Sequence, residues 1–228
     1  MGDAIELSGN GTTGRAYLAT PAQGAGPGLV VIQEHWALVP HIEDVCDRLA
    51  GEGFTALAPD LFHGVTTSEP DEADKLMMAL NLRQAAGDMG AAVDHLLASE
   101  AVRGAGVGVI GFSMGGGLAL VLATERPEDI RACVAFYGLI PWDSAHPDWA
   151  RLDAAVQGHF GEEDALFSPE QARQLEQTLR ELGKDVEVFL YPGVGHGFFD
   201  DTRPEAYDPS AASTAWTRAL EFLRAKLG

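Results

Sequence analysis

The chain has 228 residues, of which 46% are hydrophobic and 21% are charged. This is the composition of an ordinary globular domain that is large enough to bury a core without disulfides. The formal net charge of −19 at pH 7 gives a surface that repels phosphate backbones, which argues against a nucleic-acid partner. No linker-like segment or fixed-period repeat divides the sequence, so we expect one domain over residues 1–228.

The N-terminal segment has neither the basic region nor the apolar stretch of a secretory signal, and no apolar run approaches the length of a membrane span. We therefore expect a cytoplasmic protein without a membrane partner, either a monomer or a small homo-oligomer. The two cysteines, Cys46 and Cys133, lie in apolar contexts. We interpret them as buried small hydrophobic residues rather than as a disulfide pair.

Short apolar, β-branched runs alternate with longer segments of helical period, a pattern typical of a mainly parallel sheet with helices on both faces. In chain order, the sequence predicts strand 14–20, strand 28–33, helix 41–49, strand 54–60, helical segment 71–99, strand 106–112, helix 118–125, strand 133–138, strand 154–161, helix 169–182, strand 185–193 and helix 211–227. We expect the first strand, which alternates in polarity, to pair antiparallel. We expect the segment 71–99 to divide into two helices near Gly87. In such a sheet, functional side chains gather at the carboxyl ends of the strands.

A nucleophile motif follows the predicted strand 106–112. Residues 111–115 read Gly-Phe-Ser-Met-Gly, which fits the pattern G-x-S-x-G. The two glycines avoid collisions in a sharp strand-to-helix turn that exposes the hydroxyl of Ser113. The helix that follows directs its N-terminus, with the amide of Met114, at the reacting centre, where it favours negative charge. We predict Ser113 to be a catalytic nucleophile.

A serine hydroxyl needs a neighbouring base, and His196 is the candidate. It follows the last predicted strand in the loop Gly-Val-Gly-His-Gly, which could reach back over the sheet. The other histidines have simpler interpretations: His41 and His95 as surface or satisfied helix positions, His63 and His146 as loop residues, and His159 as a core residue within an apolar strand.

The acid that orients the base should follow the strand 154–161. Glu162, Glu163 and Asp164 are the candidates there. We favour Asp164, which lies beyond the turn and can point back to the histidine, and Glu163 is the alternative. A solvated acidic turn would also explain the two glutamates. The chain order serine, aspartate, histidine is that of α/β-hydrolases, so the sequence predicts a single-domain α/β-hydrolase.

Several blocks of the sequence resemble the dienelactone hydrolase family over nearly the whole chain. They are VVIQEHWALVPHIEDVCDRLAGEGFTALAPDLFHG, GVGVIGFSMGGGLAL, FYG, GHFGEED, YPGVGHGFF and RPEAYDP. The resemblance implies that Glu34 contacts the resting nucleophile. It also implies that the amide of His35 joins that of Met114 in the oxyanion hole. The alternative for Glu34 is a carboxylate satisfied by loop amides.

Two positions depart from the family pattern. Ser113 stands where the family usually has cysteine, so this nucleophile needs His196 as a base throughout the reaction. The resemblance also implies an arginine for the substrate's carboxylate four residues after the catalytic histidine, where this chain has Asp200. No arginine lies in the other expected region, 70–75, although Arg83 or Arg203 could substitute. We therefore expect a neutral ester or lactone as substrate.

Five aromatic residues flank the predicted strand ends and either line an apolar pocket or pack in the core. They are Trp36, Phe112, Tyr137, Trp142 and Phe198. The expected mechanism needs no metal or organic cofactor. Competing hypotheses are a metal-dependent hydrolase that uses Glu34, His35 and His41, although their spacing fits no ligand motif, and a non-catalytic or acyl-transferring protein on the same scaffold.

Overall fold

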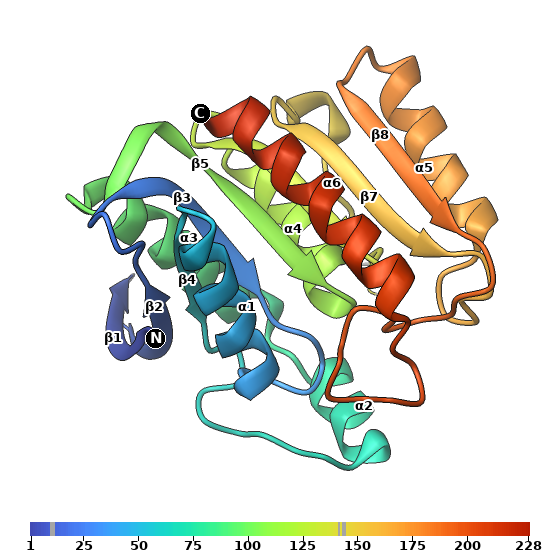
Figure 1. Ribbon diagram of the computed structural model, residues 1–228, viewed down its shortest axis with the longest axis horizontal. Helices are drawn as coiled ribbons and strands as arrows, with labels where there is room; N and C mark the ends of the chain where they lie inside the picture. The colour runs from blue at the N-terminus through green and yellow to red at the C-terminus, as the bar shows by residue number, and fades with distance from the viewer. Residues whose placement is uncertain (10–11, 141, 143–144) are drawn as a thin grey trace.

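The computed structural model describes residues 1–9, 12–140, 142 and 145–228, and a single sheet lies at the centre of this part of the chain (Figure 1). The sheet has eight strands in the order β1-β2-β4-β3-β5-β6-β7-β8. The strands are β1 (Asp3–Gly9), β2 (Thr12–Ala19), β3 (Gly26–Ile32), β4 (Thr55–Pro59), β5 (Val102–Phe112), β6 (Ile130–Phe136), β7 (Ala155–Gly161) and β8 (Val186–Tyr191). The predicted α/β architecture is therefore confirmed.

Six neighbouring strands, from β4 to β8 across the sheet, run parallel, and β2 and β1 add to one edge in antiparallel pairings. Every residue of β4 and β7 is buried, which explains why such strands read as continuous apolar runs. Strand β1 was not predicted. It lies at the edge of the sheet. Among its side chains that the structure describes, Leu7 alone is buried, so the strand's sequence shows little alternation of apolar and polar residues.

Helices cover both faces of the sheet and enclose one core on each side (Figure 1). On one face lie α1 (Pro40–Gly51) and α6 (Pro209–Leu227), and on the other lie α3 (Leu82–Ala98), α4 (Met114–Glu125) and α5 (Pro169–Glu181). Cys46 and Cys133 are both buried and free, one in each core. None of the helices in the described ranges combines the length and the apolar character that a membrane crossing requires.

The predicted break in the helical segment 71–99 is displaced from Gly87. Helix α2 (Pro70–Met78) ends before Asn81, and α3 continues through Gly87 without interruption. Asn81 starts the second helix because its side chain accepts a hydrogen bond from the Gln84 amide at 3.2 Å. The capping side chain of Asn81 therefore sets the boundary between the two helices, whereas α3 tolerates Gly87 in its interior.

Replacing Asn81 with alanine removes this cap, and we expect the free energy of unfolding to fall by about 1 kcal/mol. Urea denaturation at neutral pH measures the change. Asn81→Asp is the matched control, because aspartate caps a helix as well as asparagine does and should leave the midpoint nearly unchanged. Equal midpoints for the alanine and wild-type proteins would show that the cap contributes nothing here.

Candidate active site

Ser113 lies in the turn between β5 and α4 with backbone angles φ 51° and ψ −120°. A non-glycine residue rarely adopts a positive φ, so the surrounding structure must hold this turn in place. The glycines of the motif allow it. A Cβ on Gly111 would lie 2.0 Å from the Gly115 carbonyl oxygen, and a Cβ on Gly115 would lie 2.3 Å from that of Ile32. The crowding predicted from the motif is therefore present.

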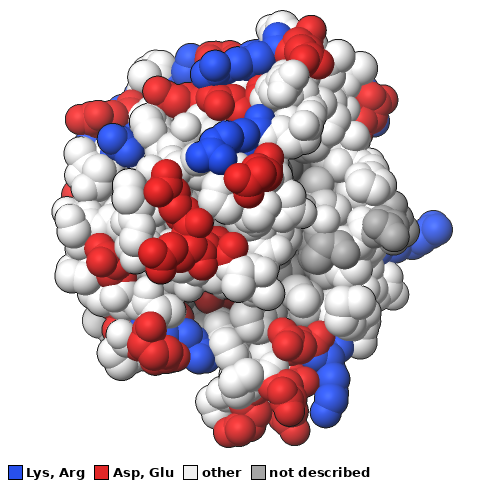
Figure 2. Space-filling view, turned by 90° about the vertical axis from the view of Figure 1, so that its right-hand side faces the viewer, with Lys and Arg blue, Asp and Glu red and all other residues white. Residues whose placement is uncertain are grey.

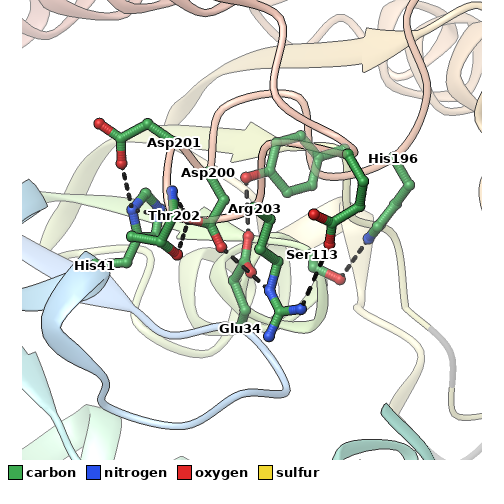
Figure 3. A network of polar contacts seen from close by, with 10 residues as sticks. Glu34, His41, Ser113, His196, Asp200, Asp201, Thr202 and Arg203 are labelled. Atoms are coloured by element: carbon green, nitrogen blue, oxygen red, sulfur yellow. Dashed lines mark hydrogen bonds and ion pairs between the residues drawn. The ribbon is translucent and has the colours of Figure 1, made fainter. Parts of the chain in front are cut away.

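The structure brings the three predicted triad residues together from three different strand ends. Ser113 Oγ lies 2.8 Å from His196 Nε2 (Figure 3), and the other ring nitrogen, His196 Nδ1, lies 2.9 Å from Asp164 Oδ2. Asp164 follows β7 and His196 follows β8, so both loops meet the turn after β5 at the carboxyl edge of the sheet. These contacts could pass a proton from the hydroxyl to the imidazole and stabilise the imidazolium that results.

Asp164 is held in place by its own loop. Its side chain is fully buried, and Oδ1 accepts hydrogen bonds from the amides of Leu166 and Phe167 at 2.8 and 3.0 Å. Its other oxygen is thereby left for the histidine. Glu163, the alternative considered from sequence, is exposed and only its backbone amide enters the loop's hydrogen bonds. The geometry therefore favours Asp164.

The two residues expected to form the oxyanion hole occupy suitable backbone positions. Met114 is the first residue of α4, where amides lack an intrahelical acceptor and the helix dipole favours an anion. His35 lies in a tight turn after β3, in which the Ala37 amide donates to the Glu34 carbonyl at 3.1 Å. Burial lowers the pKa of His35 to about 4, so its ring is neutral at neutral pH.

Glu34 is buried, and its carboxylate accepts a 2.8 Å hydrogen bond from the Tyr137 hydroxyl (Figure 3). The resemblance implied a contact with the nucleophile, but in the described part of the chain no hydrogen bond joins Glu34 to Ser113. Burial is the main cause that raises the pKa of Glu34. Tyr137 thus satisfies this carboxylate in place of the loop amides considered from sequence.

A cavity of about 250 Å³ opens beside His196. Its lining residues are Glu34, His35, Trp36, Pro70, His196, Gly197, Asp200, Arg203, Glu205 and Ala206. Trp36 is the one of the five aromatic candidates that lines it.

The other four aromatic candidates are core residues. Phe112, Tyr137 and Phe198 belong to the core under α1 and α6, and Trp142 belongs to the core on the opposite face. They lie close to the strand ends in sequence, but their side chains point into the layers between sheet and helices. For these four residues, the packing alternative is the one that the structure favours.

Arg203, Asp200 and His41 form a polar network beside the cavity that sequence reasoning did not predict (Figure 3). The Arg203 guanidinium lies over the Trp36 ring, 3.3 Å from its centre, and its Nε is 3.5 Å from Asp200 Oδ2. Asp200 Oδ1 lies 3.3 Å from His41 Nδ1. His41 is buried in α1, so of its two interpretations from sequence the surface position is wrong. Asp200 and Arg203 are three residues apart in one loop, but only tertiary folding brings this pair to His41 and Trp36.

One ligand atom each of His41, Asp200 and Asp201 lies within 4.8 Å of the others, so we tested this set as a metal site. Asp200 Oδ1 already accepts hydrogen bonds from the amide and the hydroxyl of Thr202, at 3.0 and 2.6 Å. Its other oxygen faces the Arg203 guanidinium. Both carboxylate oxygens of Asp200 thus face donors already. The three residues are better explained as part of a polar network within the protein than as ligands of a metal cation.

The mainly parallel sheet with helices on both faces is that of an α/β-hydrolase, and Ser113, Asp164 and His196 follow one another in the chain order of that fold's serine, acid and histidine. The sequence model of the dienelactone hydrolase family matches residues 15–227, and the chain belongs to that family.

Relatives cover almost the whole chain. Protein usf of Aquifex pyrophilus is 34% identical over 98% of both chains. An Aquifex aeolicus protein named for carboxymethylenebutenolidase activity is 32% identical over the full length of both. Among solved structures, a dienelactone hydrolase-like promiscuous phosphotriesterase from metagenomic libraries has a TM-score of 0.88 at 25% identity, covering 100% of this chain and 99% of that one.

His159 is predicted to make the protein sensitive to acid. Its ring is fully buried between Tyr191 and Gln157, and burial lowers its pKa to about 3. Because the unfolded chain binds this proton near pH 6.5, stability is lost as pH falls from about 6.5 to 3, by roughly 1.4 kcal/mol per pH unit.

We expect His159→Gln to flatten the dependence of the unfolding free energy on pH between 7 and 5, as measured by urea denaturation. His95→Gln, at a half-buried helix position, is the control and should keep the wild-type slope. An unchanged slope in the His159 variant would show that this histidine does not govern acid sensitivity.

Proposed function

We propose that this protein is a serine hydrolase that cleaves a small, neutral ester or lactone through an acyl-enzyme on Ser113. The proposal rests above all on one observation, the 2.8 Å contact between Ser113 Oγ and His196 Nε2, with Asp164 on the other nitrogen of the ring. Family membership supports the class of reaction, since a relative over the full chain length is named for carboxymethylenebutenolidase activity.

In the proposed mechanism, the substrate's carbonyl oxygen lies against the amides of His35 and Met114. Ser113 Oγ attacks the carbonyl carbon while His196 takes the hydroxyl proton, and the two amides stabilise the oxyanion of the tetrahedral intermediate. His196 then gives its proton to the departing alkoxide, and the acyl group stays on Ser113. Water attacks this ester with His196 again as the base, which releases the acid and restores the serine.

The charges around the cavity favour a neutral substrate. Arg203 is the one arginine or lysine among the residues lining it, and its guanidinium lies between Asp200 and Glu205 at 3.5 and 3.9 Å. Two carboxylates thus compensate one cation. Acidic side chains also gather in groups on the face next to β8 (Figure 2), in keeping with the net charge of −19. An anionic substrate would approach against this field.

The nucleophile can be tested with a fluorophosphonate probe, which we expect to label Ser113 at one equivalent per chain. Ser113→Ala should not be labelled, and both Ser113→Ala and His196→Ala should lower kcat on a chromogenic short-chain ester by about 10⁴-fold or more. Ser210→Ala, at an exposed serine of α6, is the matched control and should behave as wild type.

Full esterase activity in either active-site variant would refute the proposed triad. Labelling without turnover would instead favour transfer to another acceptor, and no labelling would favour a binding protein.

The preference for neutral substrates can be tested with a lactone and the same ring bearing a carboxylate. We expect kcat/KM to be about tenfold or more higher for the neutral ring, because the surface field opposes the anion. Raising the ionic strength should narrow the difference, since salt screens the charges. A clear preference for the carboxylated lactone would overturn this part of the proposal.

A further inference from the structure

The proposed mechanism requires two segments to keep a fixed position relative to each other, and the strands that precede them are not neighbours in the sheet. The turn 34–37, which carries the His35 amide, follows β3, whereas the loop that carries His196 follows β8. Strands β5, β6 and β7 lie between these two strands in the sheet. Contacts between side chains above the carboxyl edge can therefore join the oxyanion turn and the loop of the base more directly than the sheet does.

Arg203 makes such a contact. It belongs to the loop that carries His196, and its guanidinium carbon lies 3.3 Å from the centre of the Trp36 ring, across the cavity wall. Its Nε faces Asp200 Oδ2 at 3.5 Å and its Nη1 faces Glu205 at 3.9 Å, both within the same loop. The planar guanidinium is thus aimed from its own loop at the indole of the other segment.

Asp200 fixes the loop end of this bridge. Its side chain is 3% exposed, and Oδ1 accepts both hydrogen bonds from Thr202. The same oxygen lies 3.3 Å from Nδ1 of the buried His41, in the first turn of α1 (Figure 3). Because α1 begins at Pro40, three residues beyond the turn 34–37, Arg203 contacts the turn itself and Asp200 contacts the chain just after it.

The turn itself is strained. Ala37 has φ 83°, a left-handed conformation that costs an L-residue with a Cβ, and its amide closes the turn onto the Glu34 carbonyl at 3.1 Å. The direction of the His35 amide depends on this turn keeping its shape. A strained turn persists only where neighbouring contacts hold it, and the Trp36 side chain is the part of the turn that Arg203 contacts.

We propose that Arg203 is a positioning residue. By stacking on Trp36 while anchored to Asp200, it holds the turn 34–37 so that the His35 amide points at the oxyanion. This inference rests on the proposed function. This role differs from binding a substrate's anionic group. A positioning role requires Arg203 to affect the turnover of neutral substrates and the stability of the oxyanion.

The test compares Arg203→Ala with wild type on a neutral chromogenic ester, with kcat expressed per site titrated by a fluorophosphonate. We expect kcat to fall by about 30-fold while KM changes less than about twofold, since a misdirected oxyanion donor weakens the transition state and not substrate binding. The inhibition constant of an alkyl trifluoromethyl ketone, which forms an oxyanion on the serine, should rise by the same factor.

Variants of the two partners separate positioning from folding. Arg203→Lys should not restore kcat, because an ammonium lacks the planar surface that stacks on the indole. Trp36→Leu should lose as much as Arg203→Ala, Trp36→Phe should lose little, and the double variant Arg203→Ala/Trp36→Leu should lose little more than either single one. Arg173→Ala, at an exposed arginine of α5, is the control and should behave as wild type.

The outcomes are distinct. Wild-type kcat and ketone inhibition in Arg203→Ala would overturn the inference, as would a loss confined to the KM of carboxylated esters, which would make Arg203 a subsite for a substrate anion. Additive losses in the double variant would show that the arginine acts on something other than Trp36. Failure of the wild-type protein to react with the fluorophosphonate would instead refute the proposed function, whatever the Arg203 variants do.

Discussion

The hydrogen bond between Ser113 and His196 is the contact on which the rest of the site depends. It joins a strained turn at the end of a central strand to a loop at the far edge of the sheet, and each partner is held by separate means. The crowded glycines and the N-terminus of α4 hold the serine, whereas Asp164 and the loop amides around it hold the imidazole. In the proposed mechanism, this pair is therefore preorganised before any substrate arrives.

Several charged and titratable side chains lie beside this pair and line the cavity. Glu34, Asp200 and Glu205 supply carboxylates, and the structure gives each a specific partner: a tyrosine hydroxyl for the first, and the guanidinium of Arg203 for the other two. Burial raises the pKa of Glu34 and lowers that of His35, so both side chains are shifted toward their neutral forms. The cavity thus holds many titratable groups without a large uncompensated charge.

Much of the fold could be predicted because the parallel strands are buried on both faces and their apolar runs are long. The strand β1 and the helix boundary at Asn81 could not be predicted. An edge strand buries few side chains, and a helix cap depends on a single side chain, so neither leaves a repeated pattern in the sequence. The motif around Ser113 predicted its own geometry, since the glycines at 111 and 115 act within a few residues of the serine. The pocket residues were harder to predict, and three of the aromatic candidates pack in one core with Phe199 rather than line the cavity.

The sequence by itself determined the class of fold, the strained turn at Ser113 and the chain order of the three residues proposed to react, because local crowding, burial and chain position encode them. Tertiary structure alone decided that Asp164 rather than Glu163 faces the histidine, that Tyr137 rather than Ser113 binds Glu34, and that Arg203 reaches Trp36. Each of these choices depends on where loops from separate strands meet above the sheet. Contacts between residues that lie tens to more than a hundred positions apart leave no periodic trace in the chain.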